Sequence, residues 1–214
     1  MTARQFIKVL HIVKGEFPRW KAPVVSLIAH HHSDPFRILI ATLLSQRTRD
    51  QTTAQTSQRL FAVADTPKSM FQLPINKIVN LIYPVGFYNT KARQIHELCQ
   101  KLLFQYKGQV PSTLEELLKL KGVGRKTANL VLSLGFQKPA ICVDTHVHRI
   151  SNRLGIVKTK TPEQTERILA KKIPTRYWRS MNELLVGFGQ TLCHPMKPLC
   201  AQCPISFCPS RKIS

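Results

Sequence analysis

Acidic residues are scarce in this 214-residue sequence, in which 11 Asp and Glu stand against 32 Lys and Arg. The formal net charge is therefore +21, and the sequence pI is about 10.2. A surplus of this size excludes a charge-balanced surface and indicates a polyanionic partner. Nucleic acid is the commonest one, because Lys and Arg that contact phosphates release condensed counterions and gain affinity.

Long hydrophobic runs are also missing, and none approaches the roughly 20 residues that a membrane-spanning helix needs. An anionic membrane surface is the weaker alternative partner, since the basic residues are spread along the chain rather than gathered in one block. Near the N-terminus, Lys8, His11 and Lys14 interrupt the apolar residues, as in an amphipathic helix and unlike a signal peptide. We therefore expect a cytoplasmic, nucleoid-associated protein without a secretion signal or a membrane partner.

The sequence lacks convincing alternation of polar and apolar residues, and helical periodicity dominates, so the predicted fold class is all-α. Internal repeats and low-complexity segments are missing as well, which argues against solenoids and disordered arrays. Asp34 is a candidate N-cap, with Pro35 in the first turn of a helix that ends near residues 45–48. Further helices are expected at about 50–63, 76–83, 90–108 and 179–187. Three more are expected to begin at Ser112, which forms a capping box with Glu115, at Asp144 and at Thr161.

Residues 117–132, LLKLKGVGRKTANLVL, read as two helices joined by a turn with Gly122 and Gly124. Glycine permits positive φ and close approach, and the turn's N–H groups with the second helix start form a concavity suited to phosphate. A P-loop is excluded because Arg125 precedes Lys126 and no strand leads in, and a dinucleotide fingerprint is excluded by Thr127. For the glycine pair taken alone, a packing corner remains the alternative.

The whole string LKGVGRKTA resembles the helix-hairpin-helix of DNA glycosylases. Asp144 lies eighteen residues after Lys126, in VDTHVHRISNRLG, and both motif and spacing match the endonuclease III family of base-excision enzymes. The resemblance runs from DPFRILIATLLSQRTRD, at Asp34, to the last cysteine. It implies a two-lobed helix-hairpin-helix glycosylase fold that binds double-stranded DNA as a monomer. The hairpin residues Gly122, Val123, Gly124 and Arg125 would hold the phosphate backbone without reading sequence.

In that family the lysine at the position of Lys126 is the nucleophile and the aspartate at the position of Asp144 is its partner. A lysine amine can form a Schiff base with the sugar once partly deprotonated, which burial and the nearby Arg125 would favour. A carboxylate beside it can stabilise the oxocarbenium charge or shuttle a proton. The alternatives are a phosphate-binding Lys126 and an Asp144 that caps a helix, and we expect Asp144 to cap in any case.

A lysine at position 126 favours the bifunctional branch, because relatives that cleave only the glycosidic bond usually lack it. The resemblance thus implies removal of damaged, oxidised pyrimidines and strand cleavage 3′ to the abasic site by β-elimination. The alternatives are a monofunctional mismatch or adenine glycosylase and a non-catalytic DNA-binding protein with the same hairpin.

Cys193, Cys200, Cys203 and Cys208 form the pattern C-x6-C-x2-C-x4-C. Four thiolates can hold a zinc ion or a [4Fe-4S] cluster, and spacing alone does not choose between them. The family resemblance implies the [4Fe-4S] cluster, although the family's last gap is one residue longer. We expect Cys99 and Cys142 to be small core residues.

Two further strings carry the resemblance more weakly. A glycosylase must extrude its target base and fill the gap. In SQRTRD, either Gln46 or Arg47 corresponds to the family's inserting residue, and in GFYNTKA Phe87 corresponds to a residue that wedges beside the orphaned base. The alternatives are a capping Gln46 and a buried Phe87.

The resemblance also predicts the domain organisation. We expect a helical barrel over residues 23–135 that contains the hairpin, and an iron-sulfur domain built from residues 1–22 and 136–214.

Overall fold

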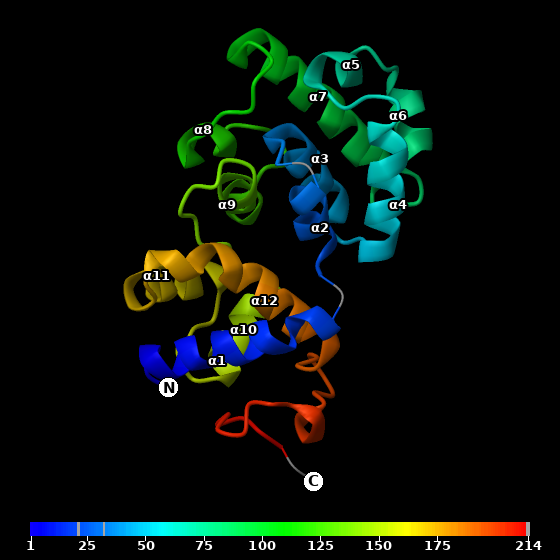
Figure 1. Cartoon of the computed structure of the whole chain (residues 1–214). Helices are drawn as coiled ribbons and strands as arrows, with labels where there is room; N and C mark the ends of the chain where they lie inside the picture. The colour runs from blue at the N-terminus through cyan, green and yellow to red at the C-terminus, as the bar shows by residue number, and fades with distance from the viewer. Residues whose placement is uncertain (21, 32, 213–214) are drawn as a thin grey trace. The chain divides into compact units, whose positions relative to one another are not determined.

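The computed structural model describes residues 1–20, 22–31 and 33–212. These residues form helices, turns and loops without a strand, so the all-α prediction is confirmed (Figure 1). The chain folds as two compact units. We call Val24–Lys138 the continuous unit, and Met1–Pro23 with Pro139–Ser214 the split unit. Over the described residues, no helix combines the length and the hydrophobicity that crossing a membrane requires.

The continuous unit is organised around one buried helix, α3 (Pro35–Ser45), in which every residue from 38 to 44 is buried. A helix that is apolar on all sides must be covered on all sides. Its neighbours α2, α4 and α9 supply most of this cover (Figure 1). The other helices of the unit are α2 (Val24–His31), α4 (Asp50–Phe61), α5 (Pro67–Phe71), α6 (Ile75–Ile82), α7 (Tyr88–Tyr106), α8 (Leu114–Leu118) and α9 (Arg125–Leu134).

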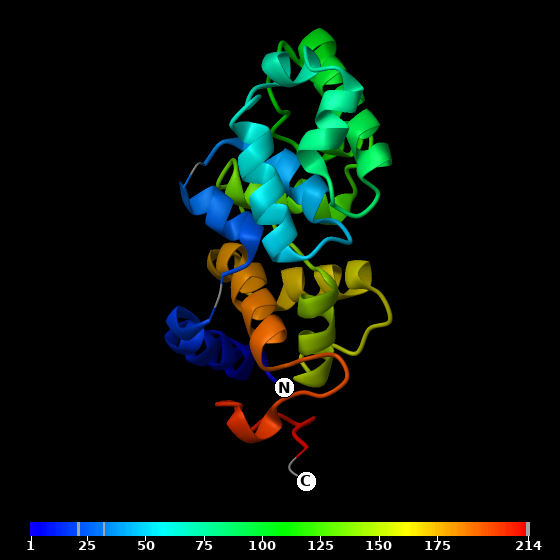
Figure 2. The same ribbon diagram turned by 90° about the vertical axis from the view of Figure 1, so that its right-hand side faces the viewer.

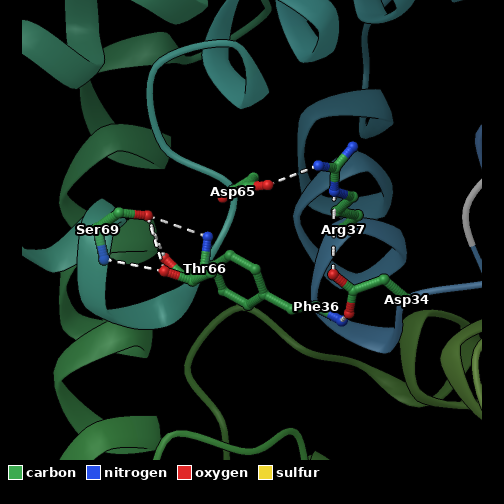
Figure 3. A network of polar contacts seen from close by, with 6 residues as sticks. All are labelled: Asp34, Phe36, Arg37, Asp65, Thr66 and Ser69. Atoms are coloured by element: carbon green, nitrogen blue, oxygen red, sulfur yellow. Dashed lines mark hydrogen bonds and ion pairs between the residues drawn. The ribbon is translucent and has the colours of Figure 1, made fainter.

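A polar network fixes the start of α3 (Figure 3). Asp34 caps the helix, with its Oδ1 accepting a hydrogen bond from the Phe36 N–H at 2.9 Å, as the sequence predicted. Arg37 forms an ion pair with Asp65 (2.6 Å between Nη2 and Oδ2), just before Thr66 and Ser69 form the capping box of α5. The first turn of α3 is thereby joined to a loop nearly thirty residues later in the chain.

The split unit packs α1 (Ala3–Glu16) and α10 (Thr145–Arg153) against α12 (Trp178–Thr191), with α11 (Pro162–Lys172) beside α10. Short 3-10 turns η1 (Phe17–Arg19), η2 (Thr175–Tyr177) and η3 (Cys200–Gln202) complete it. From the end of α12 to residue 212 the chain continues as an irregular loop whose one regular piece is η3 (Figure 2). The core of this unit includes Phe6, Leu10, Val147, Ile150, Met181 and Phe188.

Most predicted helix starts agree with the structure, including the caps at Asp144 and Thr161. The predicted box of Ser112 with Glu115 is wrong by one residue. Thr113 is the N-cap of α8, and its hydroxyl accepts a hydrogen bond from the Glu116 N–H at 3.3 Å. Ser112 and Thr113 can both cap a helix, and a one-residue choice between two such neighbours is not resolved by the sequence pattern.

Candidate functional site

The turn between α8 and α9 presents a basic helix start to solvent. Gly122 has a φ of 80°, a left-handed conformation that favours glycine, and Gly124 is the N-cap of α9 without a side-chain cap. Arg125 and Lys126 are the first two residues of α9, and both are exposed. The first turn of α9 contains no acidic residue, so its positive end is reinforced by two cations. This geometry suits a phosphate or another anion.

Val123 has a different place from its neighbours in the hairpin. Its side chain is 6% exposed, and its N–H donates to the Leu120 carbonyl at 3.1 Å. It anchors the turn, and the glycines and Arg125 form the surface. Lys126 is exposed as well, so the burial expected of its amine is not found.

Asp144 is the N-cap of α10 in the split unit, and the capping role expected of it is confirmed. Its Oδ1 accepts a hydrogen bond from the Val147 N–H at 2.9 Å, and the residue is 8% exposed. Burial lowers the pKa of Arg149, one turn later, and the nearby charges of Cys193 and Asp144 oppose that shift. The carboxylate is therefore held in one orientation in a cationic setting.

The four cysteines of the C-terminal loop line one cavity together with apolar side chains such as Ile150 and Phe188. Across the described ranges, no three or more His, Cys, Asp or Glu side chains are gathered closely enough to hold one metal ion. A zinc ion needs its four ligands around a single point, about 2.3 Å from each sulfur. The four thiols line a cavity, and no such convergence on one point is found among the residues described.

Arginines hold the cysteine loop in shape. Arg153 Nη1 donates to Cys193 Sγ at 3.3 Å and to the His194 carbonyl at 2.6 Å. Arg211 Nη1 donates to the Cys203 carbonyl at 3.1 Å. Burial raises the pKa of the thiols of Cys203 and Cys208, so a cation or a metal would be needed to keep them ionised.

The other two cysteines have the core positions that the sequence predicted. Cys99 and Cys142 are 0% and 1% exposed, and burial raises the pKa of Cys99 to about 12. A thiol in this state is protonated and unreactive.

The loops that contain Gln46, Arg47 and Phe87 lie side by side in the continuous unit. Gln46 is the C-cap residue of α3, and its Nε2 donates to the Gly122 carbonyl and to Thr127 Oγ1, both at 3.4 Å. Arg47 instead places its guanidinium carbon 5.5 Å from the centre of the Phe87 ring. Phe87 is 61% exposed, so the alternative of a buried Phe87 is wrong.

Sequence reasoning missed a lysine between these loops. Lys91 is buried and its ammonium ion binds the end of α3. A signal was present, because Lys91 falls four residues before Ile95, on the stripe of α7 that enters the core. A cation at that phase of an amphipathic helix indicates a buried polar contact.

Comparisons with known proteins agree with this geometry. Residues 40–175 match a family model described as "HhH-GPD superfamily base excision DNA repair protein". The chain is 53% identical to Endonuclease III of Thermotoga maritima over 174 residues, which cover 81% of this chain and 82% of that protein.

Two solved structures are similar over nearly the whole chain, each with a TM-score of 0.87, 36% identity and 98% of this chain covered. One is a non-covalent Endonuclease III–DNA complex, of which 96% is covered. The other is a trapped covalent Endonuclease III–DNA intermediate with an estranged adenine, of which 97% is covered.

Proposed function

This chain belongs to the endonuclease III family of the HhH-GPD base-excision DNA repair proteins, and from this membership we propose that Lys126 and Asp144 carry its chemistry. It is a DNA-binding, bifunctional enzyme: a DNA N-glycosylase that also cleaves the strand at the abasic site. The observation that carries the proposal is the exposed amine of Lys126, at the positive end of α9 directly after the glycine turn.

The first step that we propose is displacement of the base. The unprotonated Lys126 Nζ attacks C1′ of the damaged nucleotide, and the glycosidic bond breaks with its electron pair leaving on the base, which then takes up a proton. Positive charge develops on the sugar ring oxygen during this step. The Asp144 carboxylate would stabilise that charge and accept a proton from Nζ.

The second step is cleavage of the strand. Ring opening converts the C1′–Nζ bond into a protonated Schiff base, which acidifies the proton on C2′. Loss of that proton expels the 3′ phosphate by β-elimination, and water then hydrolyses the imine to release Lys126. Only a covalent amine nucleophile links the two steps, which is why one lysine can serve both activities.

The substrate that we propose is a duplex with an oxidised pyrimidine. The support for this substrate is the resemblance of the site motifs to those of the family. The proposed location of the enzyme is the nucleoid, in the cytoplasm. The glycines and Arg125 would bind the phosphates on either side of the lesion.

We also propose that Cys193, Cys200, Cys203 and Cys208 hold a [4Fe-4S] cluster. The support is that all four thiols line one cavity, despite the short gap before Cys208, and that Arg153 and Arg211 hold the loop around it. When bound, the cluster would supply covalent cross-links to a segment that has almost no regular secondary structure.

Reductive trapping tests the assignment of Lys126. Borohydride, added to the enzyme with a duplex that contains an abasic site, reduces the imine to an amine and leaves a stable protein–DNA adduct. We expect Lys126→Ala to abolish the adduct and the strand cleavage. Lys121→Ala is the matched control, because Lys121 is an exposed lysine of the same hairpin, ion-paired with Glu97 (2.6 Å). An adduct of undiminished yield with Lys126→Ala would overturn the assignment.

A further inference from the structure

A buried lysine near the start of α7 binds the exposed loop that follows α3 in the continuous unit. Lys91 is 5% exposed, and its Nζ donates to the carbonyls of Leu44 (2.8 Å) and Gln46 (2.6 Å) and to Thr48 Oγ1 (3.2 Å). An ammonium ion has three hydrogens to donate, so each has a partner. The two carbonyls lie at the end of α3, where the last turn of a helix lacks intrahelical donors and attracts a cation.

The second loop is held against the first by backbone contact. The Gly86 N–H donates to Thr48 Oγ1 at 3.1 Å, and a Cβ built at Gly86 would lie 2.5 Å from the Arg47 carbonyl oxygen. Only glycine allows this approach. Arg59 of α4 holds the start of the same loop, since its guanidinium donates to the carbonyls of Leu81 and Tyr83.

The two residues at the tips of these loops have the same unusual backbone. Arg47 has a φ of 52° and Phe87 a φ of 59°, so both are left-handed although neither is glycine. Such conformations persist only where surrounding contacts over-determine them, and they cluster at binding and catalytic sites. Both side chains are exposed, and the guanidinium lies 5.5 Å from the ring centre. The pair therefore presents a planar cation and an aromatic face to solvent.

We propose that Lys91 is a positioning residue for DNA binding, which holds the two loops so that Arg47 and Phe87 act as one stacked pair against an unpaired base of the duplex. This inference rests on the proposed function, because an unpaired base exists only once the damaged nucleotide has been extruded. Planar guanidinium and aromatic groups both stack on nucleobases, and each supports the other through a cation–π contact. Lys91 acts from below the surface and does not reach the DNA.

Binding of a duplex with one reduced abasic analogue opposite 2-aminopurine tests the proposal. The fluorescence of 2-aminopurine reports whether the base opposite the gap is stacked. We expect Lys91→Met to weaken binding to this duplex about tenfold, the order expected for losing one stacking contact, and to abolish the fluorescence change. Affinity for an undamaged duplex should stay within about twofold, since phosphate contacts are untouched.

Lys138→Met is the matched control. Lys138 belongs to the same unit, and its Nζ likewise joins two segments by donating to the carbonyl (2.5 Å) and hydroxyl (3.0 Å) of Ser112. It has no bond to either loop. The control should bind both duplexes as the unaltered protein does. Equal losses in the two lysine variants, or equal losses on both duplexes with Lys91→Met, would reduce Lys91 to a structural role and overturn the proposal.

A second measurement separates this proposal from the function on which it rests. A single-stranded abasic oligonucleotide has no opposite base, so Lys91→Met should cleave it at the normal rate at saturating enzyme, whereas Lys126→Ala should not cleave it. If Lys126→Ala still cleaves, the proposed function fails whatever Lys91 does. If Lys126→Ala and Lys91→Met both lose cleavage of the single strand, the positioning proposal fails and the proposed function stands.

The loop tips can also be tested with Lys91 left in place, which keeps the proposal falsifiable if Lys91→Met does not fold. Arg47→Ala and Phe87→Ala should each weaken binding to the gapped duplex, and the double variant should lose no more than the worse single one. Losses that multiply would mean that the two side chains act independently, contrary to one stacked unit. Lys91→Arg, which keeps the cation, should retain most of the fluorescence change.

Discussion

Three lysines of the continuous unit show how position decides what one residue type does. Lys126 is exposed at the positive start of a helix, where a second cation adjoins it. Lys91 is buried at the end of another helix and uses all three donors, and burial lowers its pKa to about 8. Lys138 is exposed and joins two segments. The first can meet a substrate, the second can only organise its surroundings, and the third has no bond to the loops that Lys91 holds.

At the same scale, Asp144 caps a helix and has a proposed catalytic role as a carboxylate. A substitution can separate these two roles. Asn caps helices as well as Asp, so Asp144→Asn should keep stability within a few tenths of a kcal/mol while lowering the lyase rate about 100-fold or more. Thermal unfolding and single-turnover cleavage of an abasic duplex measure the two effects.

Thr161→Ala is the comparison, because it removes the N-cap side chain of α11. The Thr161 hydroxyl accepts a hydrogen bond from the Gln164 N–H at 3.3 Å. This variant should lose about 1 kcal/mol of stability and keep its activity. If the Asp144→Asn enzyme cleaves at the normal rate, Asp144 only caps the helix and its proposed catalytic role is wrong.

At the scale of elements, the cysteine loop is the part of the split unit that has the least structure of its own. Between the end of α12 and residue 212 the only regular piece is η3. The helices of that unit, by contrast, share a core that includes Phe6, Val147 and Met181. A cluster would therefore stabilise the loop rather than the helices.

This difference predicts what removal of one ligand does. Cys200→Ser should lower the iron content from about four atoms per chain and abolish the visible absorption band, while far-ultraviolet circular dichroism stays helical. Cys142→Ala is the control, because Cys142 is a buried cysteine outside the loop and should keep both iron and absorption. A Cys200→Ser protein with full iron content would mean that Cys200 is not a ligand of the cluster.

Two α-helices were absent from the predicted set, and each had a physical reason to be missed. In α5 there are only five residues, too few for a period of 3.6 to show. In α2, which begins at Val24, apolar residues dominate without a polar face, so its sequence does not separate a helix from a buried strand. Both are decided by packing against longer neighbours, α2 against α3 and α5 against α7.

At the scale of the whole molecule, the net charge of +21 governs encounter with DNA more than recognition of damage. Non-specific affinity should therefore fall steeply with salt, by about 100-fold or more between 50 and 200 mM, since each neutralised phosphate contributes about 0.9 to the logarithmic slope. Titration of an undamaged duplex at several salt concentrations measures that slope.

The hairpin supplies a sharper form of the same prediction. Arg125→Gln should reduce the slope by about one, as expected for a lost phosphate contact. Lys119→Gln should leave it unchanged, because the Lys119 ammonium is paired with Glu116 at 2.5 Å. A slope near zero for the unaltered protein would contradict the prediction, made from the composition, that the partner is a polyanion.

The sequence by itself determined the all-α class and the family, because helical periodicity, caps and motif spacing are local properties of the chain. Asp34 and Asp144 cap their helices as predicted for this reason. Tertiary structure alone decided that Lys91 is buried, that Arg47 rather than Gln46 lies over the ring of Phe87, and that four cysteines line one cavity. Burial and contact between distant residues follow from how helices pack, and no short stretch of sequence encodes that packing.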